Sequence, residues 1–204
     1  MTEHYYTKSP RSESDRRRFE AVLRGRRLTF ETDAGVFSRS GVDFGSRLLI
    51  ETAEIPDGAR VLDVGCGYGP IGLAIAASLP NARVTMVDIN ERAVELARAN
   101  AGLNGIRNVT VLESDLLEAV RGQTFDAVLT NPPIRAGKAV VHRIFAEARE
   151  VLAPGGALWV VIRKQQGAPS ATAKLEELFG PDHVRTAARD KGYHVLRAGR
   201  QINC

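Results

Sequence analysis

In Val61-Leu-Asp-Val-Gly-Cys-Gly-Tyr-Gly-Pro-Ile-Gly72, an apolar strand leads through a glycine-rich turn into the start of a helix. Turns of this kind follow the first strand of open α/β sheets that bind nucleotide-like ligands. Read from Gly67, the run contains G-x-G-x-x-G, and Asp88 lies roughly 20 residues further on, a pattern that indicates a dinucleotide site. Read from Asp63, the same run gives D-x-G-x-G-x-G. The two patterns predict different ligands.

The charge of Asp63 distinguishes these ligands. A carboxylate at the carboxyl end of the strand would lie near a pyrophosphate, and two like charges about 4 Å apart repel by roughly 4 kcal/mol at an effective dielectric constant of about 20. S-adenosylmethionine has no phosphate and carries a sulfonium and an ammonium group, so the same acid attracts its amino-acid end. The sequence therefore favours S-adenosylmethionine over a dinucleotide.

Apolar strands alternate with helices from residue 61 onward. Strands are expected at 61–64, 83–88, 109–112, 125–130 and 158–162, and helices at 71–79, 91–103 and 139–152. A helix at 170–179 and two strands at 183–186 and 193–196 complete the order. Repeated βα units with such apolar strands predict a parallel sheet that helices cover on both faces.

Three acidic residues follow successive strands at one edge of this sheet. Asp63 and Asp88 end the first and second strands, and Asp115 comes just after the third. Asp88 is placed to accept hydrogen bonds from both ribose hydroxyls of an adenosine, and Asp115 or its neighbouring backbone to meet the adenine amine. Each acid alone is better explained as a helix cap or a solvated loop residue. Together they predict a single cofactor crevice.

The strand at 125–130 runs directly into Asn131-Pro-Pro-Ile134. Two consecutive prolines fix φ and remove two backbone donors, so the Asn131 amide and the nearby carbonyls are expected to point outward without partners. A carboxamide oxygen and the Pro132 carbonyl can accept both N–H groups of an exocyclic amine and aim its lone pair at an electrophile. The turn therefore predicts an amine-binding site, and with S-adenosylmethionine as the electrophile it predicts in-line methyl transfer to that amine without a strong base.

The region before residue 41 is expected to form an N-terminal module over residues 1–40, ahead of a main domain over residues 41–204. Residues 1–25 are polar, which predicts an extended lead. The alternation in residues 26–31 and the turn Asp33-Ala-Gly35 predict a small β-hairpin whose second strand is Val36-Phe-Ser38. Asp43 or Ser46 is expected to cap a helix over residues 47–53.

The composition is that of an ordinary globular protein of 204 residues, with 44% hydrophobic and 25% charged residues. No apolar stretch reaches the roughly 20 residues of a membrane span, and the N-terminus lacks the apolar core of a signal peptide, so we expect a cytoplasmic protein without a membrane partner. Cys66 and Cys204 are too few and too far apart for a disulfide framework or a metal site, so no metal is expected.

The net charge is +4, and arginines gather near the N-terminus at Arg11, Arg16, Arg17, Arg18, Arg24, Arg26 and Arg27. Clustered arginine suits phosphate, because its planar fork donates two hydrogen bonds and its charge gives the salt-sensitive attraction of nucleic-acid binding. A solvated basic arm explains the same cluster equally well. The residues alone leave both interpretations open.

These residues resemble the class I S-adenosylmethionine-dependent methyltransferases over almost the whole chain. More narrowly, the chain is similar to the methyltransferase small family in Gly35-Val-Phe-Ser38, Asp43-Phe-Gly-Ser46, Asn131-Pro-Pro-Ile-Arg-Ala-Gly-Lys138 and Trp159-Val-Val-Ile162. That family includes enzymes that methylate guanine N2 in small-subunit ribosomal RNA, and their single-domain relatives. The resemblance implies an α/β, Rossmann-like seven-stranded sheet whose last strand is antiparallel.

The site residues follow from the resemblance and the motifs together. Catalysis is expected at Asn131, Pro132, Pro133 and Ile134. Cofactor contacts are expected from Phe37, Ser38, Asp63, Gly65, Gly67, Gly69, Asp88, Ile89, Asp115, Leu116 and Asn131. Phe37 is equally well explained as a packed residue of the hairpin. Cys66 is expected to be a small buried residue, Tyr68 to pack on the cofactor or to face solvent, and Trp159 to be buried.

Ile134 narrows the choice of acceptor. Adenine-N6 and glutamine-amide methyltransferases commonly carry an aromatic residue after Asn-Pro-Pro, whereas Ile134 offers only an apolar edge, so both acceptors are disfavoured. Arg135 and Lys138 are expected to bind phosphate beside a flipped nucleotide. The leading prediction is methyl transfer to an exocyclic amine of RNA, foremost guanine N2 of 16S ribosomal RNA. A glutamine or small-molecule N-methyltransferase, and a noncatalytic RNA-binding or ribosome-assembly factor, remain alternatives.

Overall fold

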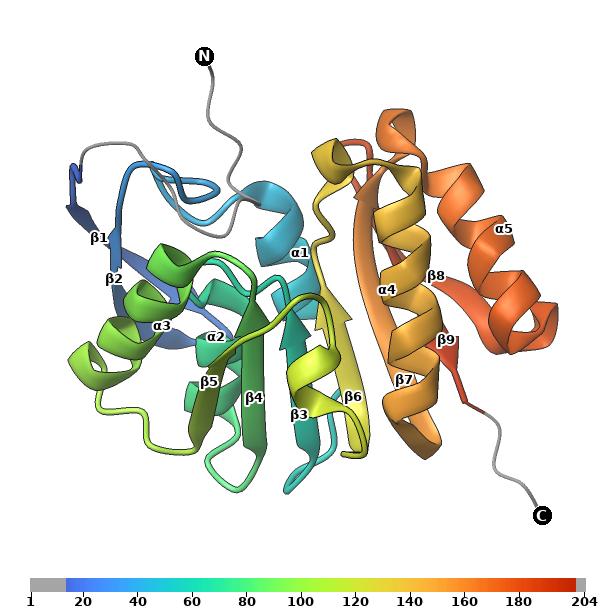
Figure 1. Cartoon of the computed structure of the whole chain (residues 1–204), viewed down its shortest axis with the longest axis horizontal. Coiled ribbons are helices and arrows are strands. Elements are labelled where there is room, and N and C mark those ends of the chain that lie inside the picture. The colour runs from blue at the N-terminus through green and yellow to red at the C-terminus, as the bar shows by residue number, and fades with distance from the viewer. Residues whose placement is uncertain (1–13, 201–204) are drawn as a thin grey trace.

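A seven-stranded sheet lies at the centre of the computed structural model, which describes residues 14–200 (Figure 1). Its strands are β3 (Arg60–Val64), β4 (Arg83–Asp88), β5 (Val109–Glu113), β6 (Phe125–Thr130), β7 (Leu152–Arg163), β8 (Val184–Asp190) and β9 (Tyr193–Gly199). They are arranged in the order β5-β4-β3-β6-β7-β9-β8. The first five pair in parallel, and β9 pairs antiparallel with both β7 and β8. The predicted sheet with an antiparallel last strand is confirmed.

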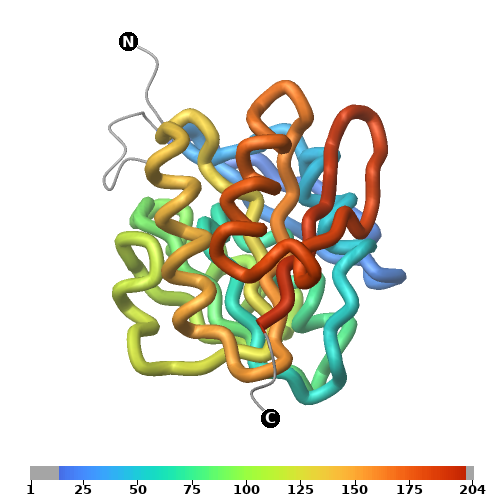
Figure 2. Tube along the Cα trace, turned by 90° about the vertical axis from the view of Figure 1, so that its right-hand side faces the viewer, coloured from blue at the N-terminus to red at the C-terminus, as the bar shows by residue number. Residues whose placement is uncertain are grey.

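Helices cover both faces of this sheet (Figures 1 and 2). The helices are α1 (Phe44–Thr52), α2 (Pro70–Ser78), α3 (Glu91–Leu103), α4 (Lys138–Val151) and α5 (Ala168–Phe179). Neighbouring strand residues point to opposite faces, so Val61 joins the apolar cluster beneath α1, α2 and α3, and Leu62 joins the cluster beneath α4 and α5. Trp159 is 1% exposed, as expected for a core strand. The short 3₁₀ turns are η1 (Glu118–Val120), η2 (Ile134–Ala136), η3 (Lys164–Gln166) and η4 (Pro181–His183).

The N-terminal hairpin differs from the predicted one. It pairs β1 (Arg17–Leu23) with β2 (Arg26–Thr32), so the expectation of an extended lead over residues 1–25 is wrong for β1. Arg24 and Gly25 connect the strands with positive φ angles of 48° and 71°, a two-residue turn whose twist suits antiparallel strands. The expected second strand, residues 36–38, lies instead in a series of turns. Residues 1–13, including Arg11, and Cys204 lie outside the described residues.

The hairpin packs against the main fold. Leu23 and Phe30 are fully buried in the same apolar cluster as α2 and α3. Two side-chain amides, from Asn100 in α3 and from Asn104 just after it, bind the edge of β2 that faces α3. Asn100 accepts from the Glu31 amide over 2.7 Å and donates to its carbonyl over 2.9 Å, and Asn104 does the same with Thr29 over 2.9 Å and 2.7 Å. The hairpin is thereby held by both apolar packing and hydrogen bonds.

Three local predictions change in the structure. The first helix begins at Phe44 and is capped by Asp43, whose Oδ1 accepts from the Ser46 amide over 3.1 Å. His183 belongs to η4 because Pro181 starts a 3₁₀ turn, and the strand begins one residue later. β7 starts at Leu152 and is much longer than the predicted strand. Among residues 14–200, no helix is both long and apolar enough to span a membrane.

Candidate active site

A cavity of about 230 Å³ opens beyond the carboxyl ends of the parallel strands. It lies where the strand order reverses, between β3, which continues to β4, and β6, which lies on the other side of β3. Of the residues predicted for the site, the following line it: Phe37, Ser38, Gly65, Gly67, Asp88, Ile89, Asp115, Leu116, Asn131, Pro132 and Pro133. The fold therefore brings the glycine turn, two strand-end acids and the Asn-Pro-Pro turn to one cavity.

The glycine turn presents bare backbone to the cavity. Gly65 and Gly67 have φ angles of 71° and 57°, and a Cβ built on either one meets no other atom within 4 Å. The turn is fixed by hydrogen bonds from Gly65 N to the Val87 carbonyl over 2.9 Å and from Gly67 N to Asp88 Oδ2 over 2.8 Å. Glycine is required here both by the left-handed backbone and by the space that the turn leaves open.

Gly69 has a different role from the one predicted. Its φ is 97°, it precedes α2, and a Cβ at this position would lie 3.0 Å from Leu73 Cδ1. Because Gly69 faces the interior and does not line the cavity, its position explains the packing of α2 and no cofactor contact.

Asp63 is fully buried beneath the glycine turn and does not line the cavity. Its Oδ2 accepts from the Gly72 amide over 2.9 Å, and its Oδ1 has no hydrogen-bond partner within residues 14–200. Burial, and then the charge of Asp88, raise the pKa of Asp63 to about 7, although the Gly72 hydrogen bond opposes the shift. In place of the expected direct contact, Asp63 offers an unsatisfied carboxylate behind the turn that a positively charged ligand group would stabilise.

Asp88 projects from the end of β4 into the cavity. Its Oδ1 accepts from the Asn90 amide over 2.9 Å, so both carboxylate oxygens are held by backbone donors. Burial raises the pKa of Asp88 more than these hydrogen bonds lower it. Ile89 and Leu116 supply apolar wall, and Asp115 lies exposed at the rim. This part of the cavity combines a fixed acceptor with apolar surface, as an adenosine requires.

The turn before α1 closes one side of the cavity. Asn90 Nδ2 donates to the Gly35 carbonyl over 3.1 Å, and Arg92 Nη1 donates to the Ala34 carbonyl over 2.6 Å, so the start of α3 holds this turn. Phe37 and Ser38 consequently line the cavity. Phe37 is 41% exposed and is therefore not the packed core residue that the alternative interpretation expected.

Asn131 is held by α1. Its Nδ2 donates to Ser46 Oγ over 3.0 Å and to Asp43 Oδ1 over 3.3 Å. The expectation that the whole amide lacks partners is therefore wrong for its nitrogen, because α1 reaches the end of β6. The hydrogen bonds leave the carboxamide oxygen as the free end. Thr130 Oγ1 also donates to the Val64 carbonyl over 2.9 Å and fixes β6 to β3 just before the turn.

Of the remaining turn residues, Pro132 and Pro133 line the cavity and Ile134 packs against the core. The Pro133 carbonyl accepts from Ala136 N over 2.9 Å as η2 begins, whereas no backbone donor within residues 14–200 binds the Pro132 carbonyl. Ile134 is turned by η2 against the apolar cluster beneath α4 and does not line the cavity. Its predicted place at the acceptor is taken by Ala136 and by side chains of α4.

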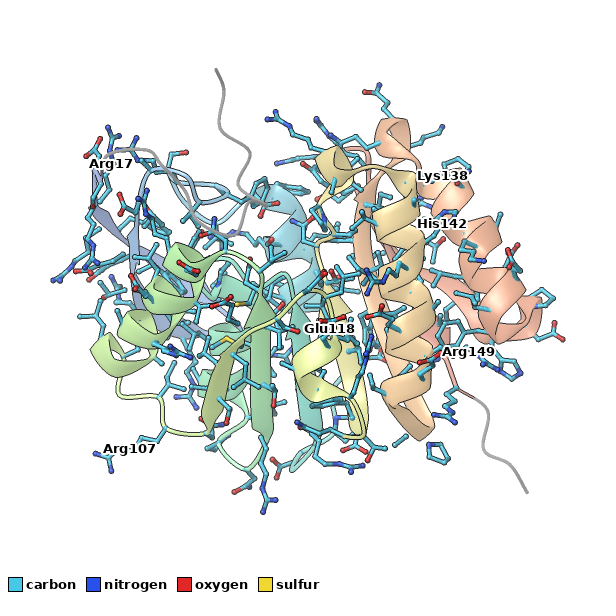
Figure 3. All side chains as sticks on the ribbon, viewed as in Figure 1. Arg17, Arg107, Glu118, Lys138, His142 and Arg149 are labelled. Atoms are coloured by element: carbon cyan, nitrogen blue, oxygen red, sulfur yellow. The ribbon has the colours of Figure 1, made fainter. Side chains whose placement is uncertain are left out.

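Arg135 and Lys138 lie outside the cavity. Arg135 is exposed on η2, and Lys138 is the first residue of α4, at the upper end of that helix (Figure 3). His142 follows one turn later, stacks on Phe145 with 6.2 Å between ring centroids, and does not line the cavity. Burial and the charges of Lys138 and Lys174 lower the pKa of His142. Arg135 and Lys138 therefore lie at the rim of the site.

Cys66 and Tyr68 line the cavity but are unsuited to act as nucleophiles. Burial raises the pKa of the Cys66 thiol well above its usual value. Tyr68 is 1% exposed, packs edge-on against Phe30 with 5.6 Å between ring centroids, and is likewise shifted to a higher pKa by burial. Within residues 14–200, no group of three or more acidic, histidine or cysteine side chains is arranged to hold a metal.

The methyltransferase small domain family matches the chain over residues 27–197. The chain belongs to this family. The uncharacterized protein YbxB of Bacillus subtilis (strain 168) is 52% identical over 200 residues, covering 97% of this chain and 98% of that protein. Ribosomal RNA small subunit methyltransferase C of Klebsiella pneumoniae is 37% identical over 174 residues, covering 83% of this chain and 49% of that protein.

A solved structure shows the same relationship. It is a T. thermophilus 16S rRNA N2 methyltransferase in complex with AdoMet and guanosine, with a TM-score of 0.83 and 31% identity over 94% of this chain and 52% of that chain. The chain thus spans about half the length of these ribosomal RNA methyltransferases. This methyltransferase small protein is an S-adenosylmethionine-dependent enzyme. The open glycine turn, the unsatisfied Asp63 oxygen and the Asp88 carboxylate fit that cofactor.

Proposed function

We propose that this protein transfers the methyl group of S-adenosylmethionine to an exocyclic base amine of RNA, with guanine N2 of 16S ribosomal RNA as the leading target. The orientation of the Asn131 amide carries the proposal. Ser46 and Asp43 hold its nitrogen, so its oxygen is the end available to an N–H donor in the cavity. A fixed acceptor of this kind suits an amine.

The Pro132 carbonyl supplies the second acceptor. It follows Asn131 directly, lines the same cavity and accepts no backbone hydrogen bond from residues 14–200. Two fixed acceptors hold both hydrogens of an amine, draw its lone pair out of conjugation with the base, and stabilise the positive charge that develops on nitrogen. Because both belong to a rigid turn, they are oriented before the acceptor binds, and such positioning can lower a barrier by roughly 7–11 kcal/mol.

The bound cofactor supplies a methyl group on a sulfonium, which is already a good leaving group. The new N–CH₃ bond forms as the S–CH₃ bond breaks, and the extra proton on nitrogen leaves to water. Asp43 accepts from Asn131 Nδ2 and from the Ser46 amide, so in this scheme it positions Asn131 and need not act as a base.

Two kinds of observation support RNA as the acceptor. The Klebsiella pneumoniae relative is a ribosomal RNA small subunit methyltransferase, and the solved relative is a 16S rRNA methyltransferase bound to guanosine. Arg135 and Lys138 are exposed at the rim, where they can meet the phosphates that flank a base. After Pro133 the cavity wall continues with Ala136, Val140 and Ile144, and position 134 holds isoleucine in place of the aromatic residue typical of adenine-N6 enzymes.

The proposal is tested by incubating the purified protein and labelled S-adenosylmethionine with total RNA, separated ribosomal subunits and protein extract. We expect label in RNA, recovered as N2-methylguanosine after nuclease digestion. Asn131→Ala should lose this labelling, and Asn81→Ala, which changes an exposed asparagine, should retain it. Label only in protein, or in a different nucleoside, would overturn the corresponding part of the proposal. Cofactor binding without transfer to either pool would favour a noncatalytic RNA-binding factor.

A further inference from the structure

Four cations gather where β7 ends and where β8 turns into β9. Arg163 ends β7, Lys164 begins η3, and Arg189 and Lys191 belong to the β8–β9 hairpin. We call these four residues the end-of-sheet cations. The Lys164 amide donates to the Gly192 carbonyl over 2.8 Å, so η3 and the hairpin turn are joined. Figure 2 shows both loops, orange and red, at the upper end of the molecule.

These cations are exposed and lack acidic partners. All four side chains face solvent, and within residues 14–200 none of them forms an ion pair within 4.0 Å. Asp190 is the acidic residue of the same turn, so positive charge dominates. Burial lowers the pKa of His194, and the positive charges of Arg189 and Lys164 lower it further, so these two cations act on the same neighbour.

Two aromatic rings hold part of this cluster in place. The Arg163 guanidinium lies over Tyr193 at 5.1 Å from the ring centroid, and Lys191 Nζ lies over Phe44 at 4.6 Å. The two rings contact each other with 5.7 Å between centroids. They are tightly packed, because a Cβ on Gly45 would lie only 2.8 Å from Tyr193 Cε1. Because the fixed rings already restrict these long side chains, the side chains lose less conformational entropy when they bind an anion.

The cluster adjoins the acceptor side of the cavity. Phe44, beneath Lys191, is the next residue after Asp43, which lines the cavity and binds Asn131. An RNA strand that places its target base against Asn131 would therefore direct the phosphates that flank this base toward the end-of-sheet cations.

The N-terminal arginines are less available. Arg18 and Arg16 both pair with Glu31, at 2.5 Å and 3.8 Å, and Arg27 pairs with Glu20 at 3.2 Å. Arg24 donates to two backbone carbonyls at the end of α1. Much of the charge that the sequence places in this cluster is thus already paired within the hairpin or held at the end of α1.

We propose that the end-of-sheet cations bind the phosphates of the RNA strand that flanks the target base. The inference rests on the proposed function, since it assigns the RNA surface of that same site. The arginine and lysine side chains supply the hydrogen-bond donors. The aromatic rings hold Arg163 and Lys191 in place beside the cavity. Contacts of this kind position a strand without reading its sequence, so the base itself is selected inside the cavity.

The test compares two double variants that each remove two positive charges. Lys164→Gln with Lys191→Asn changes the cluster, and asparagine tolerates the positive φ of 46° at position 191. Arg83→Gln with Arg107→Gln is the control, because both arginines are exposed and Arg107 lies at the opposite end of the molecule (Figure 3). RNA affinity is measured from about 50 to 200 mM salt, together with the KM for RNA and the affinity for S-adenosylmethionine.

We expect the cluster variant to reduce the slope of log affinity against log salt by roughly 1.4, because each phosphate contact with a single strand contributes about 0.7. Its KM for RNA should rise several-fold while cofactor affinity stays unchanged, and the control should match the wild type. An unchanged slope, or an equal reduction in both variants, would overturn the assignment. If the wild type labels only protein, the proposed function itself fails. If it labels RNA and the slope is unchanged, only this surface is wrong.

Discussion

The Asn131 side-chain nitrogen donates to the Ser46 hydroxyl over 3.0 Å, across 85 residues of sequence. This hydrogen bond joins the turn after β6 to the first turn of α1. The neighbouring Asp43 reinforces it and at the same time caps α1. One helix start therefore sets which end of the Asn131 amide faces the cavity.

Replacing Asn131 by alanine removes the acceptor that the proposed mechanism assigns to the methyl-accepting amine. We expect single-turnover methyl transfer to fall on the order of 100-fold, because one fixed polar group aimed at developing charge is typically worth this much. Affinity for S-adenosylmethionine, measured by calorimetry, should stay within about twofold of the wild type. Equal losses in transfer and cofactor affinity would place Asn131 in the cofactor site instead.

Ser46→Ala is a milder test of the same orientation. It removes the 3.0 Å partner of Asn131 but keeps Asp43 as the cap of α1, so the melting temperature should change little. Transfer should fall by less than in Asn131→Ala, because Asp43 still binds the amide nitrogen. If Ser46→Ala reduced transfer as strongly as Asn131→Ala, the remaining Asp43 contact would have no orienting value.

Gly65→Ala is expected to abolish cofactor binding at a small cost in stability. The added methyl group meets no protein atom and projects from the cavity wall, while the φ of 71° costs about 1 kcal/mol for a residue with a Cβ. Gly58→Ala is a matched control, since Gly58 has a φ of 72°, open surroundings and no contact with the cavity. Both variants should unfold at similar urea concentrations, and only Gly65→Ala should fail to bind S-adenosylmethionine. Equal cofactor affinity in the two would refute the position of the glycine turn.

Asp63 predicts a specific dependence of stability on pH. Its pKa is about 7 in the folded protein and 3.8 without the surrounding structure, so the folded state retains the proton more strongly between these values. The free energy of unfolding of the wild type should therefore decline relative to Asp63→Asn as pH rises from about 4 to 7, and level off above 7. The total decline is on the order of 4 kcal/mol, at about 1.4 kcal/mol per pKa unit.

The measurement is urea unfolding of both proteins without cofactor at several pH values. A constant difference between wild type and Asp63→Asn would show that Asp63 stays ionised in the folded protein, and would contradict the effect of its burial.

Leu23→Ala tests whether the hairpin is part of the core. Leu23 is fully buried, so the truncation should destabilise the protein by roughly 2–5 kcal/mol. Val22 is 52% exposed on the same strand, and Val22→Ala should cost well under 1 kcal/mol. Denaturant unfolding gives both values. Similar small effects in the two variants would mean that the hairpin contributes nothing to the fold.

The strand and helix pattern of the main domain is predictable because each element carries a complete local signal. The hairpin is not, because its turn uses Arg24 with a positive φ, where asparagine, aspartate or glycine usually marks such a turn. Residues 18–23 alternate weakly, and the charged run at residues 15–18 makes the segment resemble a solvated lead until the burial of Leu23 is known.

For the site, the sequence predicts which motifs meet at the cavity but not how each side chain is placed there. Motif spacing correctly brings Gly65, Asp88 and Asn131 to one cavity. Spacing does not reveal that Asp63 lies behind the turn, because adjacent residues of one strand end can face the cavity or the core. It also does not reveal that α1 binds the Asn131 amide, since that contact depends on where a distant helix start lies in three dimensions.

The paired amides of Asn100 and Asn104 have a consequence for the behaviour of the protein in solution. A two-stranded hairpin leaves one unpaired backbone edge on each of its strands, and such an edge can recruit a strand of another molecule. Here the two side chains occupy the donors and acceptors of Glu31 and Thr29, as the backbone of a third strand would. The protein thus caps its own edge from a helix, and this limits β-strand addition and aggregation at a hairpin that is otherwise open on that side.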